Sequence, residues 1–180
     1  MKMFISVSWR IEMSVVAAKV YDDRIVMSAD SILTNGYEKE PNINFAKIAK
    51  INDMILGGVG YGDEQSLMWL YMENHQPVEA NEREILNYII EFSKWKNTLI
   101  GDGFLKNEFL IAYKGHLFHI CKFMVREIKD YFAIGAGAPY ATTALYLKHD
   151  PEESVKVACD ICCFVSEPIK TFIQEKGDKK

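Results

Sequence analysis

Residues 14–31 read SVVAAKVYDDRIVMSADS, which is two short apolar runs separated by a polar corner. The corner is Asp22-Asp23, and the second run ends at Asp30. Short apolar runs that contain β-branched residues and are divided by turn-forming residues are typical of a β-hairpin. We therefore expect two antiparallel strands here, and the remaining segments have to fold around them.

Beyond the hairpin, two groups of strand-like runs are each followed by two runs with the apolar spacing of a helix. After a loop at 31–41, the expected strands lie at 45–51, 54–56, 109–112, 117–122 and 131–134, and the expected helices at 63–75, from about 81, at 139–147 and at 152–166. This order is not the strict alternation that gives a parallel doubly wound sheet. It predicts an α+β fold, a four-layer αββα sandwich in which two stacked antiparallel sheets are flanked by helix pairs.

Length and composition exclude several classes of protein. The chain has 180 residues, 49% of them hydrophobic, which is enough for one domain with its own core. Its net charge of −4 supplies no field that would hold a phosphate backbone, so we expect no nucleic-acid partner. Charged residues interrupt every apolar run well before the ~20 residues that cross a bilayer, so we expect no membrane association.

The four cysteines, at positions 121, 159, 162 and 163, do not suggest a disulfide framework. A domain of this size does not depend on disulfides, so we expect free thiols in the reducing cytoplasm. Cys159 and Cys162 form a CxxC pair, but no second pair and no suitably placed histidine completes a zinc site. The glycine-rich segment 57–62 lacks the Lys-Ser/Thr of a phosphate-binding loop. We therefore expect no metal and no cofactor.

Two charged residues stand inside apolar patterns. Asp30 ends an apolar strand, and Lys47 lies among Phe45, Ile48 and Ile51. A buried charge without a partner is costly, so one interpretation is that Asp30 and Lys47 need each other. The other is that both side chains point to water from strand edges, and the spacing alone leaves the two open.

Segment 14–31 resembles the first hairpin of proteasome β-type subunits and of HslV-type peptidases, which are N-terminal-nucleophile hydrolases. In that family the first residue of the mature chain is the nucleophile and an aspartate follows sixteen positions later, as Asp30 follows Ser14 here. The segment NFAKI at 44–48 resembles the one that carries the family's lysine, at Lys47. Residues 54–62 resemble the strand and glycine turn that supply the oxyanion hole, which implies an oxyanion or substrate-binding role for Gly60 and Tyr61.

The resemblance continues to the end of the expected domain, at 14–168. The segment AIGAG at 133–137 resembles the family's Gly-Ser-Gly turn, with Ala136 in place of the serine, and Asp160 matches its distal aspartate. A second departure is serine rather than threonine at position 14. Serine retains the hydroxyl that the chemistry needs. Residues 169–180 are expected to form a polar C-terminal tail.

The resemblance implies a proteasome-like peptidase that acts on peptides or unfolded proteins. Ser14 would be the nucleophile, its own α-amine the base, and Lys47, oriented by Asp30, would lower the pKa of the hydroxyl. Asp160 would orient the terminus.

An ATP-dependent unfoldase is a candidate partner. The alternatives are a catalytically inactive structural subunit of such an assembly, or an amidase of the same superfamily that acts on a small molecule.

This chemistry requires Ser14 to be the first residue of the mature chain, so residues 1–13 would have to be absent from it. Met13 followed by a small residue suits removal of an initiator methionine, and Trp9-Arg10 can be encoded by TGGAGG, which resembles a bacterial ribosome-binding sequence. We therefore expect the extension 1–13 to be absent from the mature protein, which would begin at Ser14.

The helix expected from Asp63 suggests how copies of the chain associate. Its core-facing stripe is formed by Leu67, Leu70 and Tyr71. Three further large apolar residues lie off this stripe: Met68, Trp69 and Met72. A second apolar face usually marks a contact site, so we expect a homo-oligomer, and the resemblance implies a ring. The alternative is that the chain itself covers this helix on both sides.

Overall fold

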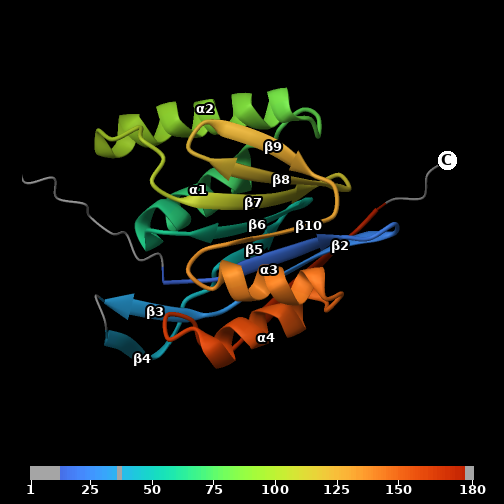
Figure 1. Cartoon of the computed structure of the whole chain (residues 1–180). Coiled ribbons are helices and arrows are strands. Elements are labelled where there is room, and N and C mark those ends of the chain that lie inside the picture. The colour runs from blue at the N-terminus through green and yellow to red at the C-terminus, as the bar shows by residue number, and fades with distance from the viewer. Residues whose placement is uncertain (1–12, 36–37, 177–180) are drawn as a thin grey trace, which may run out of the picture.

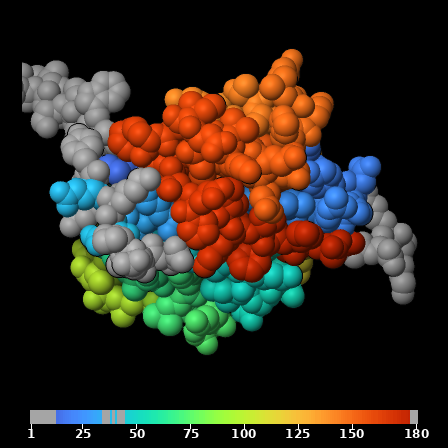
Figure 2. Space-filling model, turned by 90° about the horizontal axis from the view of Figure 1, so that it is seen from below, coloured from blue at the N-terminus to red at the C-terminus, as the bar shows by residue number. Residues whose placement is uncertain are grey.

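The computed structural model describes residues 13–35 and 38–176, and they form four layers (Figure 1). The helices are α1 (Gly62–Asn74), α2 (Glu82–Ile100), α3 (Ala138–Tyr146) and α4 (Pro151–Ile161). Helices α1 and α2 cover one sheet, α3 and α4 cover the other, and the two sheets face each other in the middle. The expected αββα sandwich is confirmed. In Figure 2, α3 and α4 occupy the near face.

The strands form two antiparallel sheets and a small separate pair. They are β1 (Val16–Val20), β2 (Arg24–Ala29), β3 (Ile32–Asn35), β4 (Glu38–Asn44), β5 (Ile48–Ile51), β6 (Met54–Val59), β7 (Glu108–Tyr113), β8 (His116–Cys121), β9 (Met124–Ile128), β10 (Tyr131–Ile134) and β11 (Lys170–Glu175). One sheet has the order β10-β1-β2-β11 and the other β5-β6-β7-β8-β9. Strands β3 and β4 pair with each other where we expected a loop, so that expectation is wrong.

The hairpin of residues 14–31 lies at the centre of the molecule. Strand β1 pairs with β2 on one side and β10 on the other. Its side chains alternate between two cores: Val16 and Ala18 face the opposite sheet, and Val15 and Ala17 face α3 and α4. Because both faces of the first part of β1 are buried, this part of the strand carries small apolar residues in a row rather than a polar and apolar alternation.

The orientation expected for α1 is confirmed for Tyr71, which is buried, and for Leu67, which packs against the core, but it is wrong for Leu70. Met68 and Met72 are fully buried in the core between α1, α2 and the five-stranded sheet, whereas Leu70 is half exposed. The helix carries large apolar residues around most of its circumference, so the pattern alone does not identify its inner face. The second apolar face is therefore covered by the protein's own chain. Among the described residues, no helix is long and apolar enough to cross a membrane.

The segment expected as a polar tail contains β11, which completes the four-stranded sheet beside β2. Its buried residue Gln174 connects the two sheets. The Gln174 side chain accepts the N–H of Gly115 at 3.1 Å and donates to the carbonyl oxygen of Asp53 at 2.6 Å. Both of these partners lie in turns of the five-stranded sheet. The end of the described chain is thus tied to both sheets.

Replacing Gln174 by Leu should lower the free energy of unfolding by about 2 kcal/mol, because two polar backbone groups lose their partner inside the protein. Chemical denaturation measures this change. The matched control is Glu175→Leu, since Glu175 is the exposed neighbour on the same strand and its replacement should change stability by less than ~0.5 kcal/mol. Equal losses in the two variants would contradict the bridging role of Gln174.

Candidate active site

A small pocket opens where β1 begins and β6 ends. Four of the residues singled out from the sequence line it together: Ser14, Lys47, Gly60 and Tyr61. The remaining lining residues are Leu33, Phe45, Gly58, Gly62, Gln65 and Asn107. These positions are spread over almost a hundred residues of sequence, and the stacking of the two sheets brings them to one place.

Ser14 is held at the bottom of this pocket and is only 2% exposed. Its hydroxyl donates to the carbonyl oxygen of Met13 at 2.5 Å, and its own carbonyl accepts the N–H of Gly137 at 3.2 Å. Gly135 has a φ of +93°, and a Cβ on it would lie 2.3 Å from the Ser14 carbonyl oxygen. The turn after β10 therefore fixes the Ser14 backbone through close approach, and only glycine fits at position 135.

Asp30 is fully buried beside the start of β1. Its carboxylate accepts the N–H of Val15 at 2.8 Å and the N–H of Ile32 at 3.3 Å. Burial raises the pKa of Asp30 to about 6, against the opposing effects of the Lys47 charge and of hydrogen bonds from the Val15, Ile32 and Ser166 amides. Asp30 thus joins the residue before β1 to the first residue of β3, and the Ser166 contact adds the segment after α4, which the sequence analysis missed.

Lys47 is 8% exposed, and burial lowers the pKa of its ammonium group while the charge of Asp30 opposes that shift. The direct pairing of these two residues that we considered is not formed. Among the described residues, no ion pair within 4.0 Å joins Lys47 to Asp30. The ammonium lies 5.4 Å from the centre of the Phe45 ring. Lys47 therefore brings a positive charge to the small pocket that Ser14 also lines, and Asp30 acts on that charge without a direct ion pair.

The glycine turn differs from the expectation in one respect. The N–H of Tyr61, expected to face an oxyanion, donates instead to Oδ1 of Asn107 at 2.6 Å. Within the described chain, no hydrogen bond uses the N–H of Gly60, whose φ is +126°. The donor for a developing oxyanion is therefore better assigned to Gly60. Asn107 lies in the region where the resemblance is weakest, and nothing in its local sequence marks it.

Two other expected positions lie apart from this pocket. Asp160 is exposed near the end of α4 and is not among the residues that line the pocket. Ala136 carries no hydroxyl, and the hydrogen bond to the Ser14 carbonyl comes from Gly137. We therefore leave Asp160 out of the mechanism below.

The cysteines lie in unreactive surroundings or outside the pocket. Burial, with smaller contributions from nearby carboxylates, raises the pKa of the Cys159 thiol to about 12, which keeps it protonated at neutral pH. Cys159, Cys162 and Cys163 are free thiols. Within residues 13–35 and 38–176, no group of three or more His, Cys, Asp or Glu side chains is arranged to hold a metal ion.

The raised pKa of Asp30 predicts a pH effect on stability. The pKa is about 6 in the folded protein and ~3.9 in an unfolded chain. The contribution of Asp30 to stability is therefore complete below about pH 4 and lost as the pH rises through 6. Asp30→Asn cannot titrate, so from pH 4 to pH 7 its unfolding free energy should rise relative to wild type by about 2 kcal/mol.

Denaturation curves at several pH values measure this difference. Asp160→Asn, which removes the same charge from an exposed position, is the control and should show no such trend. Parallel stability profiles for wild type and Asp30→Asn would contradict the burial argument.

The similarity of this chain to known proteins is found at the level of the structure. No family profile matches the sequence, and no curated protein matches it. The structure is similar to BPH, a bacterial proteasome homologue of Thiobacillus denitrificans, with a TM-score of 0.78 and 22% identity over 91% of this chain and 99% of that one. A structure of the same BPH in complex with epoxomicin gives a TM-score of 0.78 and 22% identity over 89% of this chain and 98% of that one.

Eukaryotic HslV from Trypanosoma brucei is also similar, with a TM-score of 0.66 and 19% identity over 89% of this chain and 99% of that one. The similarity extends over nearly the full length of each chain and includes both sheets and both helix pairs. The chain therefore has the four-layer fold of proteasome and HslV-like proteins.

Proposed function

We propose that this protein is a proteasome-like peptidase whose nucleophile is the hydroxyl of Ser14 at the N-terminus of the mature chain. The observation that carries the proposal is the shared pocket of Ser14, Lys47 and the glycine turn. The similarity to BPH and HslV supports it at the level of fold.

The reaction needs no group from outside the chain except substrate and water. When Ser14 is the first residue, its neutral α-amine takes the hydroxyl proton, and Oγ attacks the carbonyl carbon of the scissile peptide bond. The tetrahedral intermediate collapses to an ester on Oγ, and the leaving amine receives the proton. Water then attacks the ester carbonyl and gives a proton to the α-amine. When this second tetrahedral intermediate collapses, the carboxylic acid leaves and the ammonium returns that proton to Oγ.

Lys47 supports the first step through its charge. A cation next to the hydroxyl stabilises the alkoxide character that develops on Oγ, and it favours the neutral form of the nearby amine. Since Lys47 is nearly excluded from water, its field is screened less than that of a surface lysine. Asp30 keeps the site charge-balanced and fixes the backbone next to Ser14.

The oxyanion would be stabilised from the glycine turn. The N–H of Gly60 supplies one donor, and the N-terminus of α1 begins two residues later at Gly62. The positive end of a helix dipole favours a developing negative charge there. A single donor of this kind typically contributes ~3 kcal/mol to the transition state.

A mature chain that begins at Ser14 is part of this proposal. With Met13 attached, the Ser14 nitrogen is an amide and its hydroxyl is occupied by the Met13 carbonyl, so the base is lost. The rival hypothesis is a catalytically inactive structural subunit that retains residues 1–13. The free thiols of Cys159, Cys162 and Cys163 agree with the proposed cytoplasmic location, and an unfoldase partner stays a prediction.

A protein expressed to begin at Ser14 should hydrolyse fluorogenic peptides, and the 1–180 chain should not. Ser14→Ala in the short form should reduce the rate at least ~10³-fold, because the nucleophile is lost. Epoxomicin, the compound bound in the BPH structure, should add covalently to Ser14 of the short form, as intact mass and peptide mapping would report.

Two controls separate the hypotheses. Ser166→Ala removes a hydroxyl of the same kind near Asp30 but should retain the activity, since only the Ser166 amide contacts that carboxylate. Native expression from the gene with its upstream DNA gives the mature mass. Hydrolysis that survives Ser14→Ala would exclude Ser14 as nucleophile, and a native protein that retains residues 1–12 would favour the structural subunit.

We also propose that copies of the chain assemble into a ring. The outer surface of α3 and α4 exposes Leu147 and Ile161, which are 63% and 59% accessible. A second copy of the chain would cover them and limit the apolar surface that faces water.

Sedimentation of the short form at micromolar concentration should therefore give a mass of several subunits, and Leu147→Glu should lower it. Val78→Glu, at an exposed apolar position before α2, is the control and should leave the mass unchanged. A monomer mass for the unmodified short form would reject assembly.

A further inference from the structure

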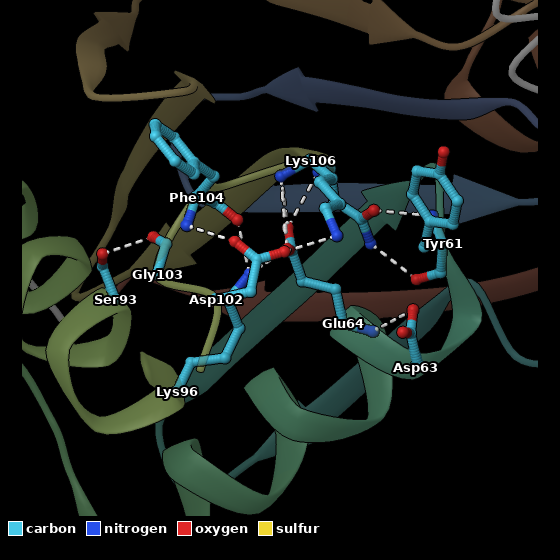
Figure 3. Close-up of polar contacts among 10 residues, drawn as sticks. Tyr61, Asp63, Glu64, Ser93, Lys96, Asp102, Gly103, Phe104 and Lys106 are labelled. Carbon is cyan, nitrogen blue, oxygen red and sulfur yellow. Dashed lines mark hydrogen bonds and ion pairs between the residues drawn. The ribbon is translucent and has the colours of Figure 1, made fainter. Parts of the chain in front are cut away.

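A buried ion pair lies behind the glycine turn, and the mechanism above does not use it. Glu64 of α1 and Lys96 of α2 are 3% and 1% exposed, and their charged atoms are 2.5 Å apart. The Glu64 carboxylate also accepts the backbone N–H groups of Lys106 and Asn107, at 2.9 and 2.8 Å. The Lys96 ammonium donates as well to the carbonyl oxygen of Phe104. Figure 3 shows these contacts as one connected set that extends to Tyr61.

Stability alone is a poor explanation for such a pair. The transfer of two charges out of water offsets most of their attraction, and apolar replacements of similar volume are often neutral or stabilising. Glu64 and Lys96 do something more specific here, because together they bind three backbone groups of the segment 104–107. The result is a fixed position for Asn107 at the start of β7.

Asn107 in turn holds the glycine turn through both backbone groups of Tyr61. Its Oδ1 accepts the N–H of Tyr61 at 2.6 Å, and its Nδ2 donates to the carbonyl oxygen of Tyr61 at 2.8 Å. Asn107 is buried and lines the pocket that contains Ser14. A Cβ on Gly60 would lie 2.4 Å from Asn107 Oδ1, so the amide reaches the turn only because position 60 is glycine.

Glycine has the widest conformational freedom of any residue, so an unrestrained Gly60 could turn its N–H in several directions. Peptide planarity means that fixing the Tyr61 N–H also fixes the plane it shares with the Gly60 carbonyl. The Gly60 N–H belongs to the preceding peptide plane, which starts at Val59 in β6. With Val59 held by the sheet and Tyr61 held by Asn107, Gly60 has little rotation left about φ and ψ, and its N–H keeps one direction.

We propose that Asn107 is a positioning residue of the proposed reaction: it directs the Gly60 N–H toward the oxyanion next to Ser14, and the Glu64–Lys96 pair holds Asn107 in place. This inference rests on the proposed function. It assigns a role in rate to residues that do not touch the substrate carbonyl. A displacement of about 1 Å in such a donor can lower the rate ~100-fold.

The kinetic experiment uses the short form that begins at Ser14. Asn107→Leu should lower kcat by about ten- to hundred-fold with less than about a three-fold change in KM, because the transition state loses an aligned donor. Asn97→Leu, the same substitution on an exposed residue of α2, should leave both constants unchanged. Unchanged kcat in Asn107→Leu would overturn the proposal.

A second variant covers the case in which Asn107→Leu does not fold. Asn107→Asp can accept the Tyr61 N–H at any pH, but it donates to the Tyr61 carbonyl only when protonated. The ratio of its kcat to that of wild type should therefore rise as the pH falls. A ratio that does not change with pH would contradict the positioning role of Asn107.

Hydrogen exchange tests the hydrogen bonds without any activity. In Asn107→Leu the peptide covering residues 57–64 should exchange faster than in wild type, while peptides from β8 should be unchanged. Unchanged exchange in 57–64 would overturn the positioning role. If the wild-type short form hydrolyses nothing, the proposed function fails and the role in rate fails with it; if wild type is active and only the Asn107 predictions fail, the proposed function stands.

Discussion

Strand β1 is enclosed on both faces, because one side of its sheet meets the other sheet and the opposite side meets α3 and α4. Two close approaches follow from this. Gly57 lies so near the strand that a Cβ there would be 2.6 Å from Cγ1 of Val16, and Gly135 lies against the Ser14 carbonyl. Interiors packed to this density transmit small displacements instead of absorbing them. The position of Ser14 is therefore set by the packing around β1 together with its own contacts to Gly135 and Gly137.

Buried charges gather at the same end of the sandwich, and they act in two different ways. Glu64 and Lys96 are in direct contact and bind backbone groups, which gives a rigid support for the glycine turn. Asp30 and Lys47 influence each other's pKa without an ion pair between them in the described chain. Lys47 thus stays available to a group in the pocket, whereas Lys96 is committed to the structure. Lys47 contributes a positive electrostatic field in the pocket, and Lys96 holds backbone groups in place.

The sequence predicted the features that depend on residues close together along the chain. The hairpin at 14–31 and the order of strands and helices follow from short-range patterns, and these were enough for the four layers. The inner face of α1 was not predictable, because Met68 and Leu70 are equally apolar and only the packed sheet distinguishes them. Strand β11 was missed because its polar residues hide the alternation, although Gln174 is buried. The role of Asn107 was out of reach, since its two partners belong to a residue 46 positions away.

The pairing of β1 and β2 with late strands also bears on how the protein is made. Val16 pairs with Ile134, and Ala29 pairs with Lys170, so the hairpin is synthesised long before either of its sheet neighbours. During that interval both edges of an apolar hairpin are open, which is a hazard for association with other chains. The Ser166 amide that reaches Asp30 is made equally late. The activity proposed for Ser14 would therefore appear only when synthesis is nearly finished.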